Sequence, residues 1–157
     1  MDNEIMNSLG KIGAAMAMTL SAVGSGLGIA ASGQAAVGAW KKCFAQNKLV
    51  PLIQMIVFIG APITQTFYGW IVMLKLIELA DAGAACYAVW GWGLFGGIAI
   101  GVSAWMQGKI AAAAADAFAD TGQGFANYLI ALGIIESVAI FVMVFIRIAA
   151  KAPVLIK

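Results

Sequence analysis

The chain has few residues that carry charge or bind transition metals. Histidine is absent, which excludes imidazole metal sites, histidine-based catalytic triads and histidine proton relays. Cysteine occurs only twice, too seldom for a disulfide framework or a four-cysteine zinc site. Charged residues make up 10% of the sequence, and the formal net charge of +2 gives no basic surface of the kind that binds nucleic acid. We therefore expect no nucleic-acid partner.

Apolar side chains fill the sequence instead. Hydrophobic residues make up 63% of the 157 residues, whereas soluble domains have about 45–50% apolar and about 25% charged residues. So few charges cannot cover the surface of a globule in water. The composition therefore predicts an integral membrane protein in contact with lipid.

Four apolar stretches are long enough to cross a bilayer as helices, which takes about 20 residues each. They cover roughly residues 10–40, 50–77, 85–115 and 125–149, separated by short polar segments. Backbone in lipid must satisfy its own hydrogen bonds, and short connections make consecutive helices antiparallel. We expect an all-α, multi-pass fold of four transmembrane helices, arranged as hairpins over residues 1–80 and 81–157. Acidic residues near the start indicate that the first span is not a cleaved signal peptide.

The two predicted hairpins resemble each other. Aligning Gln65 with Glu136 pairs polar segments of the second and fourth helices, and aligning Ser32 with Gln107 pairs alanine-rich segments of the first and third. An internal repeat of this kind indicates a duplicated hairpin.

Small residues recur along the first and third predicted helices. They allow helix backbones to pack closely in lipid. Two interpretations remain open: generic helix packing, or the thin inner wall of a ring of many copies. The glycines concerned are Gly24 and Gly28 in the first helix, and Gly93, Gly97 and Gly101 in the third.

One acidic residue stands far from any helix end. Glu136 lies about 11 residues into the fourth helix, or about 16 Å along it. A carboxylate at mid-membrane costs about 2.5–3.5 kcal/mol on insertion scales, so the default interpretation is a functional ionisable group. The alternative is a permanently protonated glutamate that only bonds a neighbouring helix.

Other polar residues are predicted at the same depth. Gln65 and Gln107 lie within a few ångströms of the level of Glu136, and positions 61, 64, 65 and 68 share one helix stripe. Pro62 indicates local plasticity in the same helix, because it lacks an N–H group. Lys109 is turned about 200° from Gln107, and its stem can extend to the near interface.

Carboxylate, amide and hydroxyl oxygens suit a small hard cation. One negative charge favours a monovalent ion, because a divalent ion would leave uncompensated charge in hydrocarbon. Na⁺ fits this donor set. A proton also fits, since protonated Glu136 could donate to Gln65 or Thr64, although a pure proton site needs fewer oxygens.

Three motifs occur in order: APITQTFYG at 61–69, QGKIAAA at 107–113 and IIES at 134–137. With the glycine-rich first helix, they resemble the duplicated-hairpin rotor-ring proteolipid of V-type and A-type ATPases, most closely its sodium-binding members. The resemblance implies Na⁺ ligands at Thr64, Gln65, Gln107 and Glu136 and at the backbone carbonyl of Ala61. Tyr68 would hydrogen-bond the carboxylate and hold it closed.

The resemblance also implies a context. The chain would form a homo-oligomeric ring in a bacterial or archaeal plasma membrane, and other subunits would hydrolyse ATP, so the chain alone is not an enzyme. A stator membrane protein would supply an arginine, and a central stalk would turn the ring. A small multidrug exporter and a structural four-helix pore without ion chemistry remain as rival classes.

Overall fold

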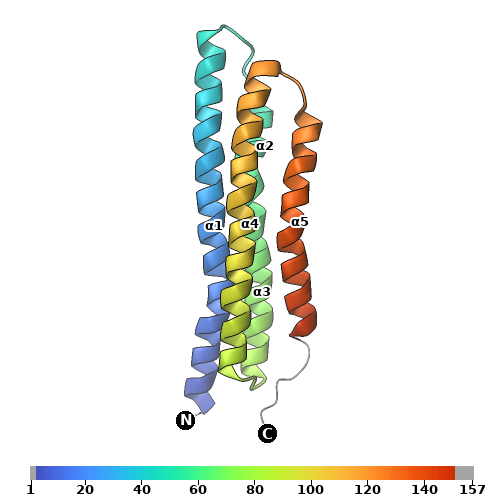
Figure 1. Cartoon of the computed structure of the whole chain (residues 1–157). Coiled ribbons are helices and arrows are strands. Elements are labelled where there is room, and N and C mark those ends of the chain that lie inside the picture. The colour runs from blue at the N-terminus through green and yellow to red at the C-terminus, as the bar shows by residue number, and fades with distance from the viewer. Residues whose placement is uncertain (1–2, 151–157) are drawn as a thin grey trace.

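The computed structural model describes residues 3–150 and is entirely helical there, apart from short connections (Figure 1). The elements are α1 (Asn3–Ala45), α2 (Leu52–Gly60), a 3₁₀ turn η1 (Ala61–Ile63), α3 (Thr64–Asp81), α4 (Cys86–Thr121) and α5 (Phe125–Ala149). Together α2, η1 and α3 form one span, so four helices are long and apolar enough to cross a membrane. The predicted all-α, four-span fold class is confirmed.

The helices differ from the predicted ranges mainly at their ends. α1 begins at Asn3 and ends at Ala45, beyond the apolar stretch at both ends. Glu4 in its first turn and Lys42 in its last turn complement the helix dipole, which favours helical extension of these polar ends. Residues 151–157, the end of the predicted second hairpin, lie outside the described residues.

α1 and α4 pack backbone against backbone, and Figure 1 shows them side by side in the bundle. A Cβ atom added at Gly24 would meet the backbone of Gly101, and one added at Gly93 would meet the backbone of Gly13. Gly28 and Gly97 lie in the same contact. All five glycines singled out in the sequence therefore serve this close approach, in which any larger residue would push the helices apart.

Apolar side chains gather in two clusters, one toward each end of the bundle. The cluster near the α1–α2 connection contains Phe58 and Phe118, with Phe125 and Tyr128 packed beside them. The other cluster contains Val72, Leu76, Ile100 and Ile146 among others. Between them, at the level of positions 65, 107 and 136, the interior is polar.

Short connections and ion pairs join the helices at both ends of the bundle. The α4–α5 turn uses Gly122 and Gly124 at φ values of 65° and 85°, a left-handed conformation that glycine adopts without steric cost. Lys42 pairs with Asp120 at this end, and Lys11 pairs with Asp81 at 2.7 Å at the other. These exposed ion pairs join different helices, although each contributes little free energy on its own.

Candidate functional site

The second span changes its winding at the depth of the polar layer. Pro62 has no N–H to donate, and the chain tightens from α-helix to 3₁₀ over Ala61–Ile63 before α3 begins. The Thr64 hydroxyl lies 3.2 Å from the Ala61 carbonyl oxygen, to which it donates a hydrogen bond. The plasticity that Pro62 indicated therefore takes the form of a defined turn, which presents this carbonyl beside the first polar side chains of α3.

The Glu136 carboxylate receives hydrogen bonds from two other helices. The Tyr68 hydroxyl of α3 donates to Oε1 at 2.8 Å, and Gln107 Nε2 of α4 donates to Oε2 at 3.3 Å. Glu136 is partly buried, and its position near the middle of α5 puts it about 16 Å from the start of that helix. Both carboxylate oxygens thus have a donor at a depth where water is scarce.

The two glutamines continue the network toward η1. Gln65 Nε2 donates to Gln107 Oε1 at 2.8 Å, and the Thr64 hydroxyl lies 3.1 Å from Gln65 Oε1. Both glutamines are 0% exposed. A buried amide with no partner would cost about 1–3 kcal/mol, so this reciprocal pairing is what makes two buried glutamines tolerable.

The backbone of α5 fixes which way both amides point. Gln107 Nε2 also donates to the Leu132 carbonyl oxygen at 3.0 Å, and a carbonyl oxygen can only accept. The amide oxygen of Gln107 must then face Gln65, whose own oxygen is turned toward Thr64. The donors and acceptors therefore run in one order from Leu132 to Gln65, and the Thr64 hydroxyl lies within hydrogen-bond distance of both Gln65 Oε1 and the Ala61 carbonyl oxygen.

The structure brings together the residues that the sequence placed at one depth. Glu136, Gln65, Gln107, Thr64 and Tyr68 form one continuous set of hydrogen bonds, with the Ala61 carbonyl at its end. The donors and acceptors come from η1, α3, α4 and α5, so the site exists only when both hairpins pack together.

Two polar contacts beside the site were not anticipated. The Ser103 hydroxyl of α4 donates to the Ile135 carbonyl oxygen at 2.9 Å, and the Thr66 hydroxyl of α3 donates to Ser25 of α1 at 2.9 Å. Ser103 precedes Gln107 by one helical turn and so shares its face. That spacing was the available signal.

Lys109 is exposed, in keeping with its predicted turn away from the site. Its Nζ lies 4.5 Å from the centre of the Trp105 ring, one turn back toward the start of α4. The stem does not extend toward the nearer, α4–α5 end of the bundle, because helical side chains lean toward the N-terminus of their own helix. A cation–π contact takes the place of the expected approach to the interface.

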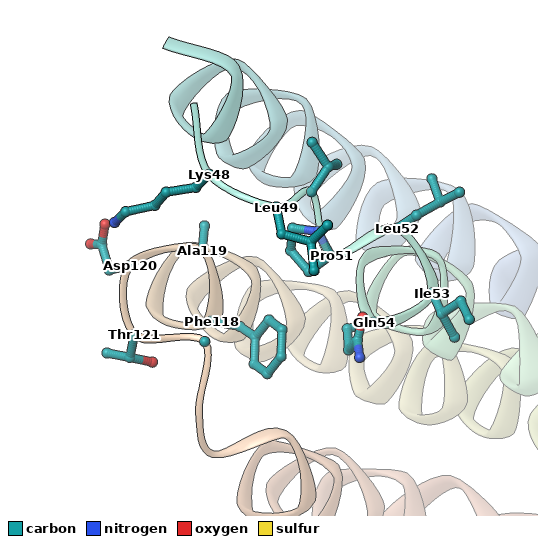
Figure 2. Close-up of a pocket in the computed structure, with 12 residues that line it drawn as sticks. Lys48, Leu49, Pro51, Leu52, Ile53, Gln54, Phe118, Ala119, Asp120 and Thr121 are labelled. Carbon is teal, nitrogen blue, oxygen red and sulfur yellow. The ribbon is translucent and has the colours of Figure 1, made fainter. Parts of the chain in front are cut away.

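A separate hollow of about 600 Å³ lies at the end of the bundle that carries the α1–α2 connection. Figure 2 shows Leu49 and Pro51 on one side of it and Phe118 on the other. Phe118 follows Gln107 by 11 residues, or about 16 Å along α4, so this hollow is distinct from the polar layer. Its lining is mainly apolar.

The polar layer has the chemistry of a site for one small monovalent cation. It offers one carboxylate together with neutral amide, hydroxyl and carbonyl oxygens, all hard donors. Within residues 3–150, no group of three or more acidic or cysteine side chains comes together. A single positive charge would neutralise Glu136 and leave the site without net charge.

Fold and site thus define a class: an integral, multi-pass helical membrane protein with one carboxylate held among amides at mid-depth. Residues 90–148 match the family of the ATP synthase C subunit. The matched segment contains most of α4 and nearly all of α5, including Gln107 and Glu136. No curated protein matches the chain. The match thus makes the second hairpin, with its mid-helix carboxylate, similar to this family of membrane proteolipids.

Proposed function

We propose that this chain forms the rotor ring of a V-type or A-type ATPase and carries Na⁺ across the membrane at Glu136. The observation that carries the proposal is the hydrogen-bond network that joins the Glu136 carboxylate to Gln107, Gln65 and Thr64. The duplicated-hairpin interpretation favours the V-type, because Gln65 stands where the first hairpin would otherwise hold a second acid.

The proposed ligands are the oxygens already gathered in the polar layer. Thr64, Gln65, Gln107, Glu136 and the Ala61 carbonyl supply more oxygens than a bound proton needs, which favours Na⁺ as the transported ion. The Tyr68 hydroxyl holds the carboxylate from its other oxygen and keeps it from swinging outward. H⁺ on the same carboxylate is the alternative.

The energetics of lipid explain why ion binding and rotation are coupled. A bare carboxylate at mid-membrane costs at least about 2.5–3.5 kcal/mol, so only a neutral, occupied site can face hydrocarbon. An arginine of the stator membrane protein would pair with Glu136 and release the ion there. A central stalk, driven by ATP hydrolysis elsewhere in the complex, would turn the ring, and the host membrane would be a bacterial or archaeal plasma membrane.

The apolar outer surface of α5 is suited to a ring in lipid. Ile134, Phe141 and Phe145 are exposed on it, and each is more than half accessible to solvent in the isolated chain. Glu136 lies on the same helix and is only partly buried, so neighbouring copies, lipid or a stator could reach it. A small multidrug exporter fits less well, since its acid would face organic cations rather than paired amides.

Labelling of Glu136 by a carboxyl-reactive carbodiimide tests the proposal. The assembled protein in membranes is treated at fixed pH with increasing NaCl, and KCl at equal ionic strength is the control. We expect Na⁺ to slow modification of Glu136 in a saturable way, because the ion occupies the carboxylate that the reagent attacks. Labelling that varies with pH but shows no effect of Na⁺ would assign the ring to protons.

A further inference from the structure

α4 reaches the backbone of α5 through two side chains on successive turns. The Ser103 hydroxyl donates to the Ile135 carbonyl oxygen at 2.9 Å, and Gln107 Nε2 donates to the Leu132 carbonyl oxygen at 3.0 Å. Both side chains are almost fully buried. Because the helices run antiparallel, one turn up α4 matches about one turn back along α5, and the two bonds form parallel cross-links.

The Ser103 contact differs from those of three other helical serines that donate a hydrogen bond. Ser21, Ser32 and Ser137 each donate to a carbonyl of their own helix, three or four residues back. That local bond is the usual choice for a helical hydroxyl. The hydroxyl of Ser103 instead crosses to another helix, although in an α-helix the Ile135 carbonyl already receives the N–H of Ala139.

The two cross-links hold the turn of α5 that leads directly into Glu136. In an α-helix the Leu132 carbonyl is the acceptor for the N–H of Glu136 itself, and Ile135 is the preceding residue. Gln107 therefore holds both the carboxylate and the carbonyl beneath it. Ser103 fixes the same turn from one step further along.

We propose that Ser103 is a positioning residue for the ion site, which sets the depth and rotation of α5 so that the Glu136 carboxylate meets Tyr68 and Gln107. This inference rests on the proposed function. A bound Na⁺ needs several oxygens at set distances at once, whereas a proton needs one carboxylate oxygen. Loss of the Ser103 bond should therefore weaken Na⁺ binding more than protonation.

The test compares Ser103→Ala with Ser137→Ala in the assembled ring. Alanine removes the hydroxyl and keeps the small size that helix packing requires. Ser137 is the matched control, because it adjoins Glu136 but bonds only within α5. For each protein, carbodiimide labelling of Glu136 gives two quantities: the Na⁺ concentration for half-protection at fixed pH, and the pH midpoint of labelling without Na⁺.

We expect Ser103→Ala to raise the Na⁺ concentration for half-protection by about threefold to twentyfold, the range for hydrogen bonds between membrane helices. The pH midpoint should move less, and Ser137→Ala should match the parent in both quantities. Equal values for Ser103→Ala and the parent would overturn the inference and leave Ser103 as a packing residue.

Failure of the proposed function has a different signature. If Na⁺ does not protect the parent protein at all, the sodium proposal fails, and the pH midpoint then decides the role of Ser103. A midpoint that shifts in Ser103→Ala but not in Ser137→Ala would support positioning in a proton-carrying ring. Equal midpoints in all three proteins would exclude it.

Discussion

Tyr68 approaches the Glu136 carboxylate from α3, opposite the amide of Gln107, and its 2.8 Å hydrogen bond is the shortest of those that reach the carboxylate. Tyr68→Phe removes only this hydroxyl, and the remaining aromatic side chain still packs against the cluster that contains Val72. Hydrogen bonds to charged groups contribute about 1.5–3 kcal/mol. The Na⁺ concentration that half-protects Glu136 should therefore rise about tenfold or more. Carbodiimide labelling at fixed pH measures this change.

Tyr128→Phe is the control for that substitution. Tyr128 packs against Phe58 in the cluster near the α1–α2 connection and not against Glu136. Loss of its hydroxyl should leave the sodium dependence unchanged. If both variants behave alike, the phenol of Tyr68 does not hold the carboxylate.

Single residues also show where reasoning from sequence succeeds and where it stops. The meeting of Gln65, Gln107 and Glu136 could be predicted, because helix rise converts residue counts into depth and lipid leaves buried amides few other partners. The role of Ser103 could not, because a helical serine normally bonds its own helix, and the spacing from Gln107 shows a shared face but not a bond to α5. Only the structure shows the 2.9 Å distance between the Ser103 hydroxyl and the Ile135 carbonyl oxygen.

At the scale of elements, the α1–α4 contact rests on positions that accept no Cβ atom. A Cβ at Gly24 would strike the backbone of Gly101, whereas a Cβ at Gly26 would meet nothing within 4 Å. Gly24→Ala should therefore push the helices apart and destabilise the protein by about 1–3 kcal/mol, as overpacking does. Gly26→Ala should be neutral or slightly stabilising, because alanine favours helix.

Thermal stability of the detergent-solubilised protein distinguishes the two glycine variants. We expect a lower midpoint of thermal unfolding for Gly24→Ala than for the parent, and no decrease for Gly26→Ala. An equal decrease in both would mean that helix flexibility, rather than close approach, is what these glycines provide.

The second span shows a similar limit of sequence reasoning. Pro62 indicated local plasticity, and by helix geometry its missing N–H leaves the carbonyl of Phe58, four residues earlier, without its usual donor. The structure places the 3₁₀ turn at Ala61–Ile63 and brings the Ala61 carbonyl to the Thr64 hydroxyl. Which carbonyl turns toward the site depends on how the turn relaxes, and packing against the other helices decides that.

At the scale of the whole molecule, the chain buries its small-residue helices against each other and leaves α5 with a broad apolar face. Such a face can contact lipid or further copies of the chain, and the sequence alone does not distinguish these two settings. The four spans and their order follow from hydropathy and connection length. The number of copies does not, because it depends on the angle between neighbouring chains.

Native mass spectrometry of the detergent-solubilised protein tests assembly and cargo together. We expect a closed ring of many chains that retains one Na⁺ per chain, because each chain offers one carboxylate in its polar layer and each site is neutral only when filled. Glu136→Gln should form the same ring without bound Na⁺, since the glutamine keeps the shape of the side chain and removes its charge. It should also abolish carbodiimide labelling at this position and stop ion transport by the complete ATPase.

A dimer would instead favour a small exporter, and a Glu136→Gln protein that still transports ions would favour a structural pore. The variant is the decisive arm, because a ring that formed but kept its Na⁺ without the carboxylate would place the cation somewhere other than the polar layer.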